Sequence, residues 1–255
     1  MKLKGIFVLL LLVAVAVGVV LVWVYLRPKT CERVEVSLQF TGNDSLLTER
    51  EVFGILKSKG VTLVGTSPGK LRRTDIENAL RTNVWFDSLL NLTPIGSTLM
   101  MEIRVKSPLL AVYPASGTPY FIGHDGEFLP DNSRVLSPLP VLSGNVNTPY
   151  TPHKNVCDLK ERTLRDAYRI ALAITADTLL ATQLTQLYVN DDSEIEAYNT
   201  LARHSVIFGH SDNIEQKMRQ LHIVYDEALI YLDPDTYSKV DVRFKNRVFA
   251  TRKNI

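Results

Sequence analysis

The sequence predicts an α+β protein with a transmembrane helix at its N-terminus. Three observations carry this prediction. An uncharged apolar run occupies residues 6–26, helix-like and strand-like segments follow within residues 34–106, and further strands with amphipathic helices fill residues 107–255. We therefore expect a β-α-α-β-β domain followed by a mixed β domain with flanking helices.

The apolar run begins at Ile6 and ends at Leu26, and it contains neither a charged residue nor a proline. As a helix it rises about 31 Å, which matches the hydrocarbon core of a bilayer. Trp23 and Tyr25 suit the membrane interface. A cleaved signal peptide is the alternative, since residues 14–16 (AVA) look like a cleavage site. The run continues about ten residues beyond that point, longer than a signal peptide needs, so we predict an uncleaved anchor.

The position of this run in the chain predicts a location. Only residues 1–5 precede it, whereas the folded bulk follows it. Basic residues flank the run on both sides and barely discriminate between orientations, so the short tail decides. We expect a single-pass protein of the cell inner membrane, with a cytoplasmic tail, a linker over residues 27–33 and a periplasmic (extracytoplasmic) bulk.

Residues 34–106 are expected to form the first domain. Alternation of apolar and polar side chains indicates half-buried strands. Thr48 and Glu51 form a capping box that starts a helix, and Gly60 ends it. The predicted elements, in order, are a strand over 34–40, helices over 48–60 and 71–81, and strands over 85–93 and 98–106.

Residues 107–255 are expected to form the second, mixed β domain. Asp125 and Gly126 lie between two short apolar segments and predict a hairpin. Apolar stripes at helical spacing predict helices over 159–176 and from Asp212 onward. The remaining predicted strands are 184–189, 205–208 and a C-terminal strand over 239–251.

Phrases in both domains resemble the FtsQ/DivIB family. Those of the first domain resemble its POTRA domain, and those of the second resemble the β domain that follows it. The phrases are residues 36–43 (VSLQFTGN), 46–52 (LLTEREV), 76–85 (IENALRTNVW), 120–126 (YFIGHDG), 139–144 (LPVLSG), 206–209 (VIFG) and 240–244 (VDVRF). Three places depart from the family pattern: Val84 stands in place of proline, Lys106-Ser107 stands before Pro108 where the family tends to have Glu-Arg, and Phe244 stands in place of tyrosine.

The resemblance implies a non-enzymatic scaffold of the division machinery. It would bind FtsB/FtsL-like division proteins and couple early and late division proteins in septum formation. Other division proteins would bind through the POTRA-like domain. The alternative is a POTRA-containing factor for outer-membrane protein assembly or secretion, but the chain lacks a run of alternating strands long enough for a membrane barrel.

We place the partner-binding site on the predicted C-terminal strand. A strand at a sheet edge presents unpaired backbone groups with which a partner segment can pair. The residues expected to contact the partner are Val242, Arg243, Phe244, Lys245, Asn246, Arg247, Val248 and Phe249. The alternative is that this strand only completes the sheet and that its charged side chains are solvated.

Composition and motifs point away from other functions. With 29 basic and 27 acidic residues, the net charge of +2 gives no reason to expect nucleic-acid binding. No Gly-rich loop leads into a helix, so we expect no cofactor and no small-molecule substrate. Cys31 and Cys157 are too few for a disulfide framework, and two unpaired thiols are the simpler expectation.

Candidate metal and catalytic residues have simpler explanations. His222 and Asp226 lie four residues apart on a predicted helix, where a half-buried histidine is expected rather than a ligand. His204 and His210 have no metal-ligand spacing and are expected to lie on the surface. The acidic residues near 191–192 and 233–235 lie among turn formers. We therefore expect no metal site and no catalytic activity.

Overall fold

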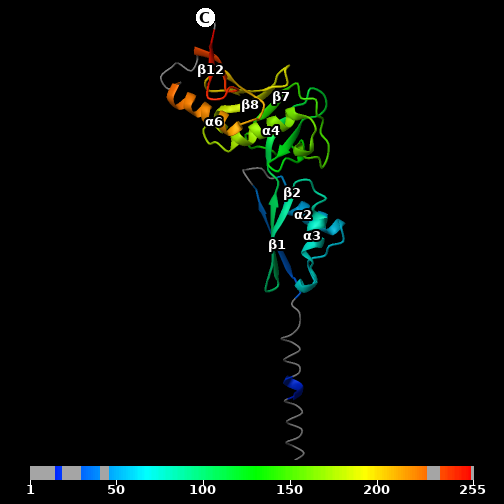
Figure 1. The fold of residues 1–255 in the computed structure, drawn as a ribbon. Coiled ribbons are helices and arrows are strands. Elements are labelled where there is room, and N and C mark those ends of the chain that lie inside the picture. The colour runs from blue at the N-terminus through cyan, green and yellow to red at the C-terminus, as the bar shows by residue number, and fades with distance from the viewer. Residues whose placement is uncertain (1–14, 19–29, 41–45, 229–235, 254–255) are drawn as a thin grey trace, which may run out of the picture. The chain divides into compact units, whose positions relative to one another are not determined.

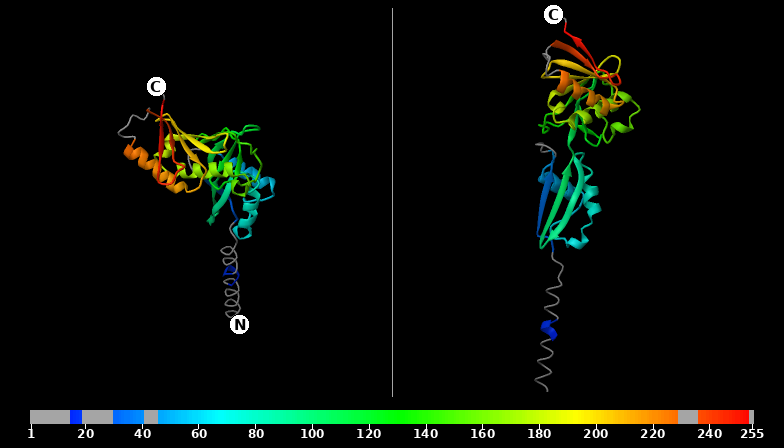
Figure 2. Two further views of the ribbon diagram at one scale, coloured as in Figure 1. Left: turned by 45° about the horizontal axis from the view of Figure 1, so that its top comes forward. Right: turned by 60° about the vertical axis from the view of Figure 1, so that its left-hand side comes forward.

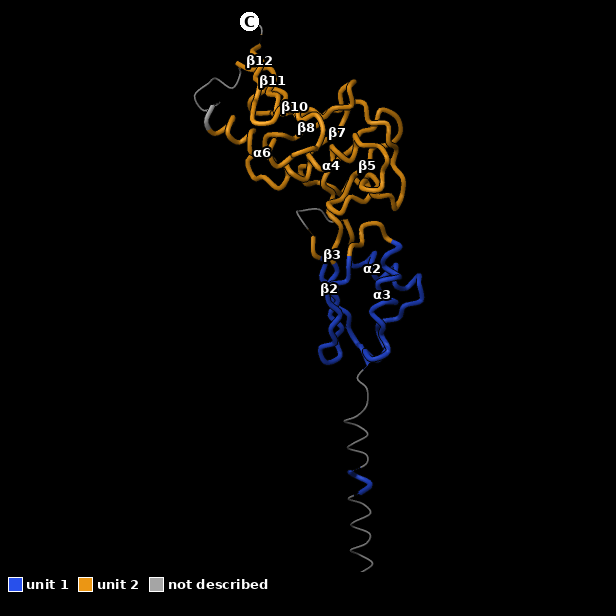
Figure 3. The backbone as a smooth tube through the Cα atoms, in the orientation of Figure 1, with its two compact units in different colours: residues 1–38, 49–82, 88–103 blue, residues 39–48, 83–87, 104–255 orange. Residues whose placement is uncertain are grey.

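The computed structural model describes residues 15–18, 30–40, 46–228 and 236–253. The chain divides into two compact units (Figure 3). Unit 1 comprises residues 1–38, 49–82 and 88–103, and unit 2 comprises residues 39–48, 83–87 and 104–255.

The prediction of a membrane-spanning helix is corrected here. Within the described ranges, no helix is both long enough and apolar enough to cross a membrane. A crossing needs about 20 apolar residues in one helix. Of the segment 6–26, only residues 15–18 are described, as helix, and the rest lies outside the described residues. The expected single-pass location in the inner membrane loses its support for the same reason.

Unit 1 contains the predicted β-α-α-β-β order. Its elements are β1 (Arg33–Gln39), α2 (Glu49–Ser58), a 3-10 turn η1 (Pro68–Lys70), α3 (Arg73–Leu80), β2 (Phe86–Ile95) and β3 (Thr98–Val105). The three strands form a sheet in the order β1-β3-β2. Alternate residues of β3 are buried, among them Met101 and Ile103, as expected for a strand with one face on a core. Ile76 and Leu80 of α3 are buried in the same unit.

Unit 2 is built on a nine-stranded mixed sheet. Its strands are β4 (Pro108–Val112), β5 (Tyr120–Gly123), β6 (Phe128–Pro130), β7 (Val141–Gly144), β8 (Leu184–Val189), β9 (Ile195–Asn199), β10 (His204–Gly209), β11 (Tyr237–Asp241) and β12 (Phe249–Arg252). Their order in the sheet is β12-β11-β10-β9-β8-β7-β4-β5-β6. The predicted hairpin is confirmed, since β5 and β6 pair antiparallel and Gly126 adopts a positive φ of 81°.

Two main helices cover one face of this sheet, α4 (Arg162–Thr175) and α6 (Ile214–Ile223) (Figures 1 and 2). Shorter helical pieces are η2 (Val156–Asp158), α5 (Leu180–Gln183) and the π-helical turn η3 (Val224–Ala228). Buried residues of the helices and of the inner sheet face form one hydrophobic cluster. The face of the sheet under the helices and the helix faces turned toward it are both apolar, so packing them together removes both from water.

The C-terminus differs from the prediction. In place of one strand over 239–251, the structure has two antiparallel strands, β11 and β12, joined by a turn. Asn246 in this turn adopts a positive φ of 59°, a conformation that asparagine tolerates better than most residues. The alternating apolar pattern is typical of both arrangements, because two short strands and one long strand share the same period.

Candidate partner-binding edge

The eight residues predicted to bind a partner occupy three different environments. Val242 directly follows β11 and is 0% exposed. Its N–H donates to the carbonyl of Ile207 on β10 at 3.1 Å. Val242 is therefore a core residue, and its side chain is not available to a partner.

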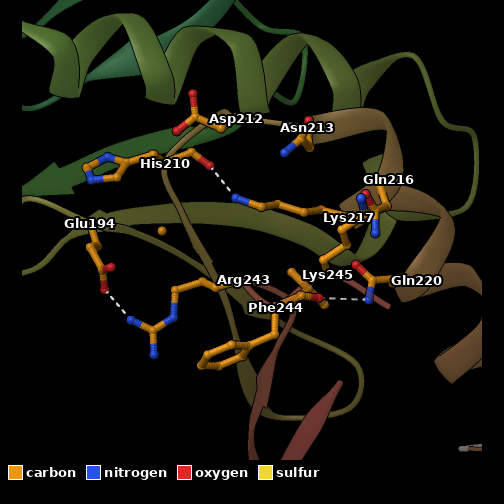
Figure 4. Close-up of a pocket in the computed structure, with 12 residues that line it drawn as sticks. Glu194, His210, Asp212, Asn213, Gln216, Lys217, Gln220, Arg243, Phe244 and Lys245 are labelled. Carbon is orange, nitrogen blue, oxygen red and sulfur yellow. Dashed lines mark hydrogen bonds and ion pairs between the residues drawn. The ribbon is translucent and has the colours of Figure 1, made fainter. Parts of the chain in front are cut away.

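Arg243 is committed to contacts within the chain (Figure 4). One Nη donates to Glu194 at 2.7 Å, and the other Nη donates to Asp241 at 2.7 Å. The hydrogen bonds to Asp241, followed by those to Glu194, raise the pKa of Arg243 above its usual value. The stem of Arg243 lies over Gly209, where an added Cβ would come within 2.9 Å of Cδ. Arg243 fastens the turn to the sheet, and two carboxylates balance its charge.

Side-chain amides of α6 hold the rest of the turn. Gln220 donates from Nε2 to the carbonyls of Phe244 at 3.0 Å and Arg247 at 3.2 Å. Gln216 donates to Oδ1 of Asn246 at 3.1 Å. The sequence analysis did not select Gln216 and Gln220, although their spacing of four residues places both on one face of the helix.

Two aromatic rings remain exposed beside this turn. Phe244 is 47% exposed and Phe249 is 52% exposed. Their ring centroids are 5.0 Å apart, with an interplanar angle of 78°. Edge-to-face packing of this kind stabilises the pair and leaves one side of each ring to solvent. The pair is an apolar projection at the end of the sheet.

β12 forms one edge of the nine-stranded sheet, and all four of its residues are exposed. The N–H of Lys253 donates inward to the carbonyl of Thr236 at 2.9 Å. Since successive N–H groups of a strand point to opposite sides, those of Ala250 and Arg252 point outward. The bond from Val242 N–H to the carbonyl of Ile207 gives the same register. Because the N–H of Val242 points toward β10, the N–H groups of Asp241 and Lys239 point the other way, toward β12.

Basic side chains surround this edge. Apart from Arg243, those of β11, the turn and β12 are exposed and form no ion pair with another described residue. They are Lys239, Lys245, Arg247 and Arg252. An incoming segment would therefore meet a positive rim around an open strand.

A family model described as FtsQ/DivIB, C-terminal related, matches residues 107–251. The match covers more than half of the 255 residues and includes the whole turn and most of β12. The chain belongs to this family. FtsQ/DivIB proteins are non-enzymatic proteins of cell division, which gives the chain a role in that process. No curated protein matches the chain.

The match begins after unit 1, so it does not bear on the POTRA resemblance of residues 34–106. That resemblance stays a prediction. The candidate edge, in contrast, lies within the part of the chain that the FtsQ/DivIB model describes.

A cavity of about 230 Å³ lies beside the turn in this FtsQ/DivIB region (Figure 4). Lys217 points into it, but its Nζ donates to the carbonyls of Phe208 at 2.8 Å and His210 at 2.7 Å. Burial lowers the pKa of Lys217, while Asp212 and other nearby carboxylates oppose that change. Lys217 thus ties α6 to the end of β10. Gln220, which also lines the cavity, holds the turn.

Ser211, His210 and Asp166 form a group near this cavity that resembles a hydrolytic triad in composition only. The Ser211 hydroxyl donates to Asp166 at 2.5 Å, and His210 contacts the other oxygen of Asp166 at 3.1 Å. Serine and histidine therefore share the carboxylate, and the serine hydroxyl is not hydrogen-bonded to the imidazole that would act as its base in a triad. The group ties the loop after β10 to α4.

The remaining candidates have structural partners. His222 lies 2.5 Å from Asp177 and 3.9 Å from Asp226, and so links α6 to the segment after α4. Cys31 is a buried thiol and Cys157 an exposed one, and neither is in a disulfide. Within the described ranges, no three His, Cys, Asp or Glu side chains are grouped closely enough to hold a metal.

Proposed function

We propose that this chain is a non-enzymatic division scaffold that binds FtsB/FtsL-like proteins by adding one of their segments to β12. The observation that carries the proposal is the open edge, where Ala250 and Arg252 direct backbone N–H and C=O groups outward. A partner strand pairing there would gain main-chain hydrogen bonds. The Phe244–Phe249 pair would supply the buried aromatic anchor that dominates many interfaces.

Charge narrows the kind of segment that fits. The rim of Lys239, Lys245, Arg247 and Arg252 favours a partner strand carrying aspartate or glutamate. The same charges disfavour pairing of β12 with a second copy of itself, since lysine and arginine would face their own kind. We infer that such a partner couples early to late division proteins, and that unit 1 binds further division proteins.

The test is the affinity of the full chain for the FtsB/FtsL-like proteins of the same organism. Ala250→Pro removes an outward N–H and places a ring against the incoming strand, without removing a bond to β11. We expect a loss of about 2–3 kcal/mol, or roughly 30- to 150-fold in Kd. Ala250→Ser keeps the N–H and is the matched control. Phe244→Glu should weaken binding as well, because it replaces the aromatic anchor with a charge.

Val242→Pro is not a suitable test, because Val242 is buried and its N–H is bonded within the sheet. Equal affinity of Ala250→Pro and Ala250→Ser would move the binding site away from β12. Absence of binding by the folded wild-type chain would reject these proteins as partners.

A further inference from the structure

A polar cluster is buried where η3 packs on strands β9 and β10. His204 begins β10 and is only 1% exposed. Its Nε2 lies 3.0 Å from the hydroxyl of Tyr225 in η3. Asn199, at the end of β9, contacts the same hydroxyl at 2.9 Å. None of these side chains belongs to the partner-binding edge.

The hydrogen-bond partners of Asn199 and Tyr225 indicate which ring nitrogen of His204 carries the proton. The side-chain oxygen of Asn199 accepts from the backbone N–H groups of Leu201 at 3.0 Å and Ala202 at 2.8 Å. Its amide nitrogen must therefore donate, and it does so to Tyr225 and to Gln183. We assign the Tyr225 proton to the bond with Nε2 of His204, because no other acceptor for it is among the hydrogen bonds of the described residues. This assignment leaves the imidazole neutral, with its proton on Nδ1.

Nδ1 of His204 is buried and has no hydrogen-bond partner among the described residues. The carbonyl of Ala202 is close enough to favour the charged form, but it does not meet hydrogen-bond geometry. A buried N–H without an acceptor is uncommon in folded proteins. Protonation of the ring is costly, because it adds a positive charge to this buried site beside an N–H that already lacks an acceptor.

No carboxylate among the described contacts faces His204. The groups that face it are Tyr225 from η3, Asn199 from β9 and the positive charge of Lys253 after β12. Asp226, next to Tyr225 in the chain, faces His222 instead. Burial lowers the pKa of His204, and Lys253 adds to this, against the opposing effect of Ala202. Burial also raises the pKa of Tyr225 to about 12, so the phenol keeps its proton.

We propose that His204 is an acid-sensitive lock, which holds η3 against β9 and β10 while its ring is neutral and releases η3 when the ring gains a proton. A proton on Nε2 would displace the Tyr225 proton from this hydrogen bond and place an uncompensated charge in the core. This proposal does not rest on the function proposed above.

The direction of the pH effect follows from proton linkage. The folded-state pKa of His204 is below the unfolded value of about 6.5, so the unfolded chain takes the proton first. The stabilising contribution of the neutral ring is complete above about pH 6.5 and is lost as the pH falls. The equilibrium constant for unfolding should rise by up to about tenfold per pH unit below that point.

The test is urea unfolding of the full chain between about pH 7.5 and pH 5, without any partner. His204→Gln can still accept from Tyr225 but does not titrate, so its unfolding constant should depend less steeply on pH, by about one proton. His153→Gln is the matched control, because it removes an exposed histidine outside this cluster, and it should change the slope less than His204→Gln does. Equal slopes for wild type and His204→Gln would overturn the lock.

A second measurement uses the wild-type chain and does not depend on any variant being folded. In an NMR titration of the wild-type chain, the His204 ring should stay neutral as the pH falls through about 6.5, the value of an unperturbed histidine. Amide protons of η3 and β10 should lose exchange protection as His204 becomes charged. A His204 signal that titrates near pH 6.5 with no change in this protection would reject the proposal. Because no partner is present, either result is independent of the binding experiment.

Discussion

The two edge strands of the nine-stranded sheet differ in their exposure, since β6 is covered and β12 is open. β6, at one edge, has Phe128 and Leu129 fully buried and ends in Pro130. Residues 154–156 lie along it, and the N–H of Phe128 donates to the carbonyl of Lys154 at 2.8 Å. β12, at the other edge, is exposed throughout and has a strand neighbour on one side only within the described chain.

Edge strands invite pairing with other chains, and proteins suppress this with cover, proline or charge. β6 has the first two, because a neighbouring segment covers it and Pro130 lacks an N–H. β12 has only charge, which repels another basic edge but attracts an acidic one. One edge is therefore closed, and the other is left open, as the proposed addition of a partner strand requires.

The largest effect that separates the two edges should come from removing a phenylalanine at each. Phe128 is buried and stacks on Tyr120 with centroids 5.0 Å apart, so Phe128→Ala should cost about 3–5 kcal/mol of unfolding free energy. Phe249 is half exposed, so Phe249→Ala should cost less than about 1 kcal/mol. Urea unfolding of the full chain measures both values. Similar losses at both positions would contradict the contrast between the edges.

Partner binding should rank these positions in the reverse order. Phe249→Ala should weaken binding about tenfold, because an exposed aromatic anchor is lost. The comparison needs a milder change at β6 that keeps the chain folded, and Phe128→Leu serves this purpose. Its affinity for the partner should match that of the wild type.

A smaller effect is expected from the cover of β6. Asn155 caps η2 by accepting from the N–H of Cys157 at 2.9 Å, and it donates to the carbonyl of Asp125 at 2.9 Å. Asn155→Ala should lower the unfolding free energy by about 1–2 kcal/mol. Faster hydrogen exchange at the Phe128 amide would show that the cover has loosened. An unchanged exchange rate there would mean that Asn155 does not hold the cover in place.

The contrast between the edges was only partly visible in the sequence. Asp125-Gly126 predicted the β5–β6 hairpin because turn chemistry is local. The cover of β6 comes from residues about 25 positions later in the chain, and nothing in the local pattern of 154–156 indicates it. The sequence analysis also predicted β11 and β12 as one strand, since Asn246 is the only interruption of the apolar face and the turn is held by Gln216 and Gln220 of α6.

The structure separates the residues of the predicted binding site in a way that the sequence pattern does not show. Sequence periodicity cannot separate Val242, which is buried, from Phe244, which is exposed, because both lie on the same predicted strand face. The partners of Arg243 could not be foreseen either, since Glu194 lies 49 residues away in the chain. Outward backbone groups depend on register, which only the structure gives.

The smallest expected change in unfolding free energy distinguishes two basic residues of the same turn, Arg243 and Lys245. Arg243 bonds to Asp241 and Glu194 and packs over Gly209, whereas Lys245 is exposed and forms no ion pair with a described residue. Arg243→Ala should therefore lower the unfolding free energy by about 1 kcal/mol, and Lys245→Ala by less than about 0.5 kcal/mol. Lys245→Ala should instead slow association with an acidic partner and reduce its dependence on salt, because an exposed rim charge acts mainly on the encounter rate. Stopped-flow association at low and high salt, beside urea unfolding, measures both. If Arg243→Ala changed only the association rate, the guanidinium would belong to the open edge rather than to the framework that holds it.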